Sequence, residues 1–415
     1  MAVAVAGVTL GCLVAADLAL RWYFARRSAD DYRVHADSYV AVPWAKQYWD
    51  EYGALDTEWH SYVYWRHRPF DGRFITIDER GLRKTSNPAE CSAPQGHATR
   101  ATRIFVFGGS TIWGVGSRNE NTIPSLVSRA LQEPGRLVAC VTNFGEVGYV
   151  MTQEVFTLVL ELEQGRRPDI VVFLDGYNDA FAAFQSGTAG SPQNEFHRRD
   201  TFATRERPYA TLLKAGGQIV RDSGMYKLAE RINARRGTSA TAGPPKTSRD
   251  ERLAAQVVSV YSANVRLVEA LGAAYGFKSL FYWQPSVFSK RTLTAWEASE
   301  ARRHQAGGAF FLLTTAALGN DHALTTQARV HDLSQAFADC RDAIFIDYVH
   351  LSEGANEIIS SHIAHDLKLV IPNGPSPAIQ EIPGSPARPN RVGESQATCH
   401  NFGERSHHAS RSIIP

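Results

Sequence analysis

The sequence predicts an α/β protein built on a parallel sheet. From residue 103 onward, apolar runs alternate with helical patterns, which is the order expected when helices cover both faces of such a sheet. Polar segments that carry chemically useful groups follow three of these apolar runs. The carboxyl ends of parallel strands meet at one edge, where ligands bind, so we expect these segments to converge there.

The first 27 residues predict an N-terminal hydrophobic anchor. Ala2 to Ala16 contains no charged residue, and a span of about 20 apolar residues is reached only by including Asp17, which would pair with Arg21. A signal peptide or a buried helix is the alternative, although no Lys or Arg precedes the run. We therefore expect a membrane-associated protein with a single N-terminal helix, whose side of the membrane stays open because the flanking charges are few and mixed.

Residues 28–100 predict a small lead-in module and a linker. The run Tyr62–Phe70 is rich in aromatic residues, and Arg73–Asp78 alternates in polarity, which is typical of short strands. Residues 87–102 contain prolines and a glycine without apolar periodicity, which favours a linker.

Residues 101–371 form the predicted main domain. We expect five strands, at residues 104–107, 137–141, 170–174, 278–283 and 343–346. We expect helices that begin near Thr122, with Pro124 in the first turn, and at residues 152–163, 252–275, 328–337 and 352–369. A polar insertion occupies about residues 186–250, and the tail at 372–415 has the composition of a disordered segment.

Composition and missing motifs exclude several classes of function. The formal net charge of +2 gives no strong field for nucleic acid. The five cysteines are scattered without a C-x-x-C pair, so they support neither a zinc site nor a dense disulfide framework. The chain lacks both common phosphate-binding glycine motifs, and Ile112 stands where a lipase-type elbow requires glycine. We expect no cofactor, no metal and no nucleic-acid partner.

Ser110, Asp347 and His350 are the candidate catalytic residues. Ser110 follows a buried strand and two glycines, where a serine can be a nucleophile or a helix cap. Asp347 and His350 lie three positions apart after an apolar run, so one turn can direct both toward the same cleft. In that geometry the imidazole takes the proton from the serine while the carboxylate holds the ring.

Ester chemistry also needs donors for the developing oxyanion. Candidates are the backbone N–H of Ser110, a backbone N–H at Gly148, and the side-chain amide of Asn178. Turn formation is the alternative role for Gly148, and a turn or cap is the alternative for Asn178.

Four short blocks together resemble the SGNH, or GDSL-type, hydrolases. They are Gly108-Gly109-Ser110 with Trp113-Gly114, Asn143-x-Gly145-x-x-Gly148, Gly176-x-Asn178-Asp179, and Asp347-x-x-His350. The resemblance covers about residues 103–185 and 278–370, and Gly109 departs from it where the family pattern has Asp. It implies a flavodoxin-like three-layer α/β/α fold with Ser110 as nucleophile, His350 as base and Asp347 as its partner. It also implies an oxyanion hole formed by Ser110, Gly148 and Asn178.

The expected function is hydrolysis of an acyl or acetyl ester of a lipid, glycan or small molecule through an acyl-enzyme. Two alternatives remain open: a membrane-associated O-acyltransferase that uses the same residues, and an inactive module that binds acylated glycans. The resemblance slightly favours a location outside the cytoplasm, against weak charge evidence.

Overall fold

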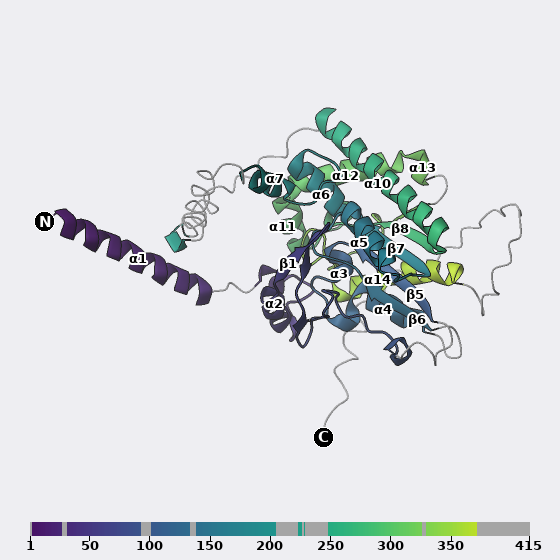
Figure 1. Ribbon diagram of the computed structural model, residues 1–415, viewed down its shortest axis with the longest axis horizontal. Coiled ribbons are helices and arrows are strands. Elements are labelled where there is room, and N and C mark those ends of the chain that lie inside the picture. The colour runs from purple at the N-terminus through teal and green to yellow at the C-terminus, as the bar shows by residue number, and fades with distance from the viewer. Residues whose placement is uncertain are drawn as a thin grey trace, which may run out of the picture.

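A computed structural model describes residues 2–26, 31–92, 101–132, 138–204, 223–225, 228, 248–325 and 329–371. Its centre is a five-stranded parallel sheet in the order β6-β5-β7-β8-β9 (Figure 1). The strands are β5 (Thr102–Gly108), β6 (Ala139–Asn143), β7 (Ile170–Asp175), β8 (Lys278–Trp283) and β9 (Val330–Asp332). The predicted α/β class and the prediction of a five-stranded parallel sheet are confirmed.

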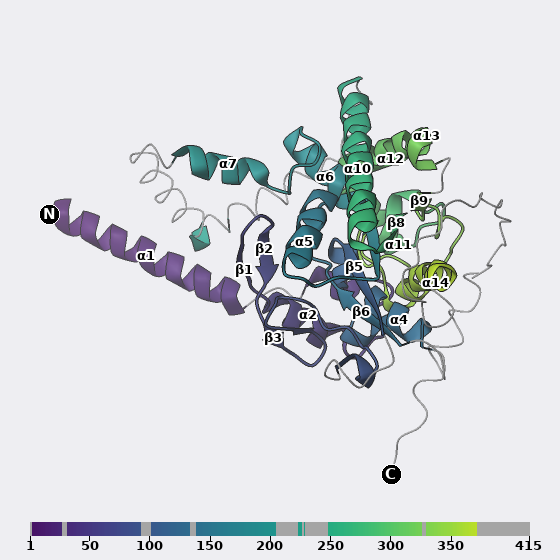
Figure 2. The same cartoon turned by 45° about the vertical axis from the view of Figure 1, so that its right-hand side comes forward.

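Helices cover both faces of this sheet and make three layers (Figure 2). Side chains alternate along β5, so Phe105 and Phe107 pack on one face and Ile104 and Val106 on the other. The first face is covered by α5 (Met151–Glu163), α6 (Tyr177–Ser186), α10 (Ser248–Tyr275) and α12 (Gln305–Gly319). The second face is covered by α4 (Ile123–Ala130) and α14 (Glu353–Val370). The remaining short elements are α3 (Ser110–Trp113), α11 (Ala295–Arg303), α13 (His322–Thr325), η3 (Asn119–Asn121) and η4 (Val287–Ser289).

Two predicted helix starts are confirmed by their capping contacts. The Thr122 side chain accepts a hydrogen bond from the Ser125 backbone N–H at the start of α4. The Ser352 side chain does the same for Ala355 at the start of α14. Both hydroxyls satisfy a backbone donor that has no partner inside its helix, which explains why these helices begin where they do.

The prediction of the fifth strand was wrong. The fifth strand is β9, whereas residues 343–346 form only an isolated bridge between Phe345 and Leu351. The Ile344 and Phe345 backbone N–H groups donate to the buried Glu297 carboxylate, so a side chain takes the place of a neighbouring strand. The helix predicted at 328–337 was also wrong, because residues 330–332 form β9 and turns follow; residue 328 lies outside the described residues.

The lead-in module packs directly on the main domain. It contains η1 (Tyr32–His35), α2 (Ala45–Gly53), β1 (Thr57–His60), β2 (Tyr64–His67), β3 (Phe70–Asp71), β4 (Thr76–Ile77) and η2 (Ala89–Ser92). The predicted short strands are therefore present. Tyr48 and Trp49 share a hydrophobic cluster with Trp113 and Ile346 of the main domain. A disulfide between Cys91 and Cys140 joins the end of the module to β6.

The N-terminal segment forms the helix α1 (Ala2–Arg26), but its predicted role as a membrane anchor is not supported. Among the helices of the described residues, none combines the length and the apolar character that a membrane span requires. The charge-free run stops at Ala16, and the Arg21 Nε lies 2.7 Å from the Asp17 carboxylate within the same helix. The predicted tail at 372–415 lies outside the described residues, as does most of the insertion beyond α7 (Glu195–Thr204).

Candidate active site

The carboxyl ends of β5, β6 and β7 carry three of the four sequence blocks to one edge of the sheet. β5 lies between β6 and β7 in the sheet. The strand that follows β5 in the sequence therefore lies on one side of it, and the next strand lies on its other side. Such a reversal of strand order opens a crevice at the carboxyl ends of the strands. The loops after these strands place Ser110, Gly148 and Asn178 around that crevice.

Ser110 is the first residue of α3, and Gly109 is the cap that precedes it. The side chain of Ser110 therefore does not cap this helix, which removes the alternative role considered for it. The residue is buried, with 8% of its surface exposed. Its hydroxyl is thus held in a fixed place at the sheet edge.

The structure brings Ser110 together with Asp347 and His350. The Ser110 Oγ lies 2.7 Å from His350 Nε2, and His350 Nδ1 lies 2.6 Å from Asp347 Oδ2. The other carboxylate oxygen, Asp347 Oδ1, accepts the backbone N–H groups of Val349 and His350. The Asp347 carboxylate therefore binds both the backbone of residues 347–350 and the His350 ring, and these contacts orient the imidazole toward Ser110.

Asp347 is held in its ionised form. Burial alone would raise the pKa of this carboxyl group, but the charge and hydrogen bonds of His350, together with the charge of Arg33, hold the pKa of Asp347 well below its usual range. An ionised carboxylate can only accept, so His350 Nδ1 donates to it and Nε2 is left free to accept the serine proton.

Arg33 is a residue of this site that sequence reasoning missed. Its guanidinium lies 3.5 Å from Asp347 Oδ2, is anchored to Asp31 at 2.7 Å, and stacks 4.0 Å above the centre of the Trp49 ring. Arg33 belongs to the lead-in module, 314 positions before Asp347. No motif links two residues at such a separation, and the only signal in the sequence is the set of aromatic residues around Arg33.

α11 supports the loop that carries Asp347. Glu297 and Lys290 form a fully buried ion pair with an N–O distance of 2.5 Å. Glu297 of α11 also accepts the backbone N–H groups of Ile344 and Phe345. The indole N–H of Trp296, on the same helix, donates to the carbonyl of Ile346. The segment immediately before Asp347 is therefore fixed by side chains rather than by a sheet.

Asn178 lies against the turn that precedes Ser110. Its Nδ2 donates to the Tyr149 carbonyl at 2.8 Å, which leaves a second N–H on the same nitrogen. A β-carbon at residue 109 would lie only 2.1 Å from that nitrogen, so the amide can approach only because residue 109 is glycine. A side chain at residue 109 would therefore displace the Asn178 amide from this position.

Gly148 lies in the loop after β6, next to Tyr149. Its φ of +79° is in the region that favours glycine. The geometry thus allows each of the three predicted oxyanion donors to lie at the crevice.

Three buried carboxyl groups lie behind Asn178. They belong to Glu154, Asp175 and Asp179, and all are inaccessible to solvent or nearly so. Burial raises the pKa of Asp179 to about 7, although backbone N–H groups, first that of Met151, oppose the shift. Burial also raises the pKa values of Glu154 and Asp175 well above the usual range. At neutral pH this cluster therefore carries less negative charge than three free carboxylates would.

The arrangement around Ser110 matches what nucleophilic catalysis requires. It contains a hydroxyl hydrogen-bonded to a base, a base oriented by a carboxylate, and a side-chain amide against the turn that carries the hydroxyl. Among the residues that the structure describes, no group of three His, Cys, Asp or Glu side chains is arranged to hold a metal ion.

Comparisons with known proteins give matches among solved structures. No family model and no curated protein matches the chain. A putative arylesterase from Agrobacterium tumefaciens str. C58 is 14% identical, with 65% of this chain and 100% of that chain covered and a TM-score of 0.36. A lipase/acylhydrolase from Enterococcus faecalis is 12% identical, with 66% and 100% covered and a TM-score of 0.37.

A third structure is a putative lipolytic protein of the G-D-S-L family from Desulfitobacterium hafniense DCB-2. It is 9% identical, with 64% of this chain and 98% of that chain covered and a TM-score of 0.34.

Proposed function

We propose that this protein is a serine ester hydrolase that cleaves an acyl or acetyl ester through an acyl-enzyme on Ser110. The observation that carries this proposal is the pair of short contacts that link Ser110 Oγ to His350 Nε2 and His350 Nδ1 to Asp347. The substrate class is an ester of a glycan, a lipid or a small molecule.

In the first half-reaction, Ser110 Oγ attacks the carbonyl carbon of the ester while its proton passes to His350 Nε2. Asp347, which stays ionised, stabilises the resulting imidazolium. The tetrahedral intermediate collapses when the bond from carbon to the alkoxy oxygen breaks. His350 returns the proton to that oxygen, so the alcohol leaves and the acyl group remains on Ser110.

In the second half-reaction, His350 takes a proton from water, and the water oxygen attacks the acyl carbon. The second intermediate collapses when the bond from the acyl carbon to Ser110 Oγ breaks. His350 returns the proton to Oγ, which restores the Ser110 hydroxyl, and the carboxylic acid leaves. In both steps the oxyanion receives hydrogen bonds from the Asn178 amide and from the backbone N–H groups of Ser110 and Gly148. Loss of one such donor costs about 3 to 4 kcal/mol of barrier in comparable sites.

The proposal is tested with p-nitrophenyl acetate and the full chain. We expect serine-dependent release of p-nitrophenol, and a loss of about three orders of magnitude or more in kcat for Ser110→Ala or His350→Ala. Ser361→Ala is the matched control, because Ser361 is an exposed serine on α14. Equal turnover by the Ser110→Ala variant and the native protein would refute the proposal.

A further inference from the structure

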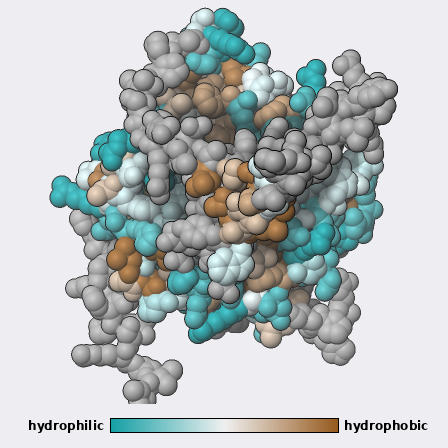
Figure 3. Space-filling view, turned by 90° about the vertical axis from the view of Figure 1, so that its left-hand side faces the viewer, coloured by the Kyte–Doolittle hydropathy of each residue, from teal (hydrophilic) through white to brown (hydrophobic). Residues whose placement is uncertain are grey.

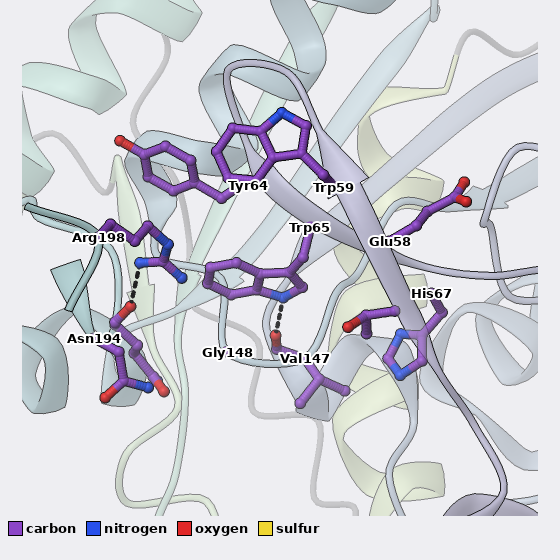
Figure 4. A pocket seen from close by; sticks show the side chains of 11 residues that line it. Glu58, Trp59, Tyr64, Trp65, His67, Val147, Gly148, Asn194 and Arg198 are labelled. Carbon is purple, nitrogen blue, oxygen red and sulfur yellow. Dashed lines mark hydrogen bonds between the residues drawn. The ribbon is translucent and has the colours of Figure 1, made fainter. Parts of the chain in front are cut away.

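A pocket of about 530 Å³ lies beside the candidate active site. Three parts of the chain form it: the hairpin β1–β2 of the lead-in module, the loop after β6, and the segment that leads into α7 (Figure 4). Its lining residues are Thr57, Glu58, Trp59, Tyr64, Trp65, His67, Val147, Gly148, Gln193, Asn194 and Arg198. None of the functions described so far uses the hairpin side of this pocket.

Aromatic rings form the hairpin wall of the pocket. Trp65 is fixed by a hydrogen bond of 2.9 Å from its indole N–H to the Val147 carbonyl. Trp59 lies opposite Trp65 in the hairpin. The Trp59 ring also contacts the Tyr64 ring, and the centres of these two rings are 5.4 Å apart. Trp59 is nevertheless 67% exposed, so one face of a large indole is left to solvent at the pocket. Figure 4 shows these three rings grouped on the hairpin side, with Arg198 and Asn194 facing them.

Polar groups are interleaved with the rings. The side-chain amides of Gln193 and Asn194 supply hydrogen-bond acceptors and donors. The Arg198 guanidinium lies 4.6 Å from the centre of the Tyr64 ring and 4.8 Å from that of the Trp65 ring, and it donates to the Gln193 carbonyl, so it is held in place. Figure 3 shows a face of the molecule on which apolar and hydrophilic side chains alternate.

This mixture fits a sugar ring better than an acyl chain. The aliphatic C–H groups of a pyranose pack against the negatively charged face of an aromatic ring, while its hydroxyls exchange hydrogen bonds with amide and guanidinium groups. An acyl chain would remove water from Asn194 and Arg198 without replacing those hydrogen bonds, which is costly.

The pocket is continuous with the oxyanion donors. Gly148 belongs to both, and a β-carbon at Gly148 would contact Gln193 at 3.4 Å and Trp65 at 3.5 Å. Gln193 also donates to the Asn178 Oδ1 at 3.2 Å, and Asn178 in turn lies against the turn before Ser110. A sugar seated on the hairpin therefore lies against Gly148, and Gln193 links the pocket to Asn178.

We propose that this aromatic pocket is the subsite for a pyranose ring of an O-acylated glycan, whose ester group is presented to Ser110. The proposal rests on the proposed ester hydrolase function and narrows its substrate to the glycan class. Trp59, whose indole is exposed, provides the stacking surface, and Asn194 and Arg198 bind the hydroxyls.

The test compares Trp59→Ala, Trp59→Phe and Tyr62→Ala in the full chain. Tyr62 is the matched control, because it is an aromatic residue of the same hairpin, is 71% exposed and does not line the pocket. The substrates are partially O-acetylated xylotetraose, cellotetraose and galactotetraose, with release of acetate as the readout, and p-nitrophenyl acetate as the small ester.

We expect Trp59→Ala to lower kcat/KM for at least one acetylated tetraose about ten-fold more than it lowers kcat/KM for p-nitrophenyl acetate, which corresponds to about 1.4 kcal/mol. The loss should lie mainly in KM, and Trp59→Phe should restore most of it. Equal effects of Trp59→Ala and Tyr62→Ala on all three tetraoses would overturn the proposal. A selective loss toward long-chain p-nitrophenyl esters would also overturn it, since the pocket would then hold the acyl chain.

Calorimetric binding of the deacetylated tetraoses to the Ser110→Ala variant separates this proposal from the proposed function. Binding that Trp59→Ala abolishes supports the subsite even if the protein hydrolyses no ester. Absence of binding by all three tetraoses, together with serine-dependent hydrolysis of p-nitrophenyl acetate, would refute the subsite and leave the hydrolase function standing.

Discussion

At the scale of single residues, the candidate site depends on one carboxylate that stays charged although it is buried. Asp347 is only 2% exposed, and a buried carboxylate needs positive partners and donors to remain ionised. Two backbone N–H groups, His350 and Arg33 supply them. Arg33 is the only one of these groups that comes from the lead-in module, so the module contributes to the electrostatics of the site as well as to packing.

Replacement of this arginine tests its contribution. We expect Arg33→Gln to lower kcat/KM for p-nitrophenyl acetate by about three- to ten-fold, and to shift the acidic limb of the pH–rate profile to higher pH. The reason is that the pair Asp347–His350 takes up a proton more readily once the neighbouring positive charge is removed. Arg33→Lys keeps the charge and should recover part of the activity.

The control for this experiment is Arg291→Gln, which removes an exposed arginine that pairs with Asp339. A pH–rate profile of Arg33→Gln with an unchanged acidic limb would show that Arg33 acts only through packing.

At the scale of elements, the loop before Asp347 is held by α11 instead of by strand pairing. Glu297 accepts two backbone N–H groups of this loop and the ammonium group of Lys290, and neither of the paired side chains is exposed. We expect Glu297→Gln to lower the free energy of unfolding by about 3 kcal/mol, because it leaves the buried Lys290 charge without its partner. The urea midpoint measures this loss, and activity should fall with it.

Glu251→Gln serves as the control, because Glu251 is an exposed carboxylate in the first turn of α10. Equal urea midpoints for the two variants would contradict the role assigned to Glu297.

The same loop shows why the sequence predicted most of the fold but not all of it. Strands β5, β7 and β8 are apolar runs in the sequence, so their pattern predicts them. β9 is Val330-His331-Asp332, a short and mostly polar edge strand without an apolar signal. Residues 343–346 have that signal, but their apolar side chains are buried beneath the loop and α11, and their backbone bonds to Glu297. An apolar pattern in the sequence indicates that side chains are buried. It does not indicate which group forms hydrogen bonds with the backbone of the segment.

In the candidate site too, local motifs could be predicted from the sequence and tertiary contacts could not. Ser110, Asp347, His350 and Asn178 belong to short blocks with fixed spacing, so the sequence could nominate them. Arg33 and Gln193 act through tertiary contacts from segments outside those blocks, and no spacing could have identified them.

At the scale of the whole molecule, the buried carboxyl groups behind the site make stability depend on pH. The pKa of Asp179 is about 7 in the folded protein, well above the value of about 4 for an exposed aspartate. The protonated carboxyl group of Asp179 therefore makes its full contribution to the free energy of unfolding below about pH 4, and this contribution is lost as the pH rises through about 7. Glu154 and Asp175 shift in the same direction. The free energy of unfolding should accordingly fall as the pH rises from about 4 to about 7.

Asp179→Asn tests this dependence. The amide keeps the oxygen that accepts the Met151 backbone N–H and cannot ionise. We expect the variant to gain on the order of 1 to 3 kcal/mol over the native protein at pH 8.5, and little or nothing at pH 4. Urea unfolding at the two pH values measures the difference, with the exposed Asp37→Asn as control. A gain of equal size at both pH values would exclude ionisation as the cause.

The most direct test of the account is to trap the nucleophile. The full chain is treated with diethyl p-nitrophenyl phosphate, and the modified residue is located by peptide mass spectrometry. We expect one diethylphosphoryl group on Ser110, no labelling of Ser110→Ala, and much slower labelling of His350→Ala. Labelling of a different residue, or no labelling of a protein that hydrolyses p-nitrophenyl acetate, would contradict the assignment of Ser110 as the nucleophile.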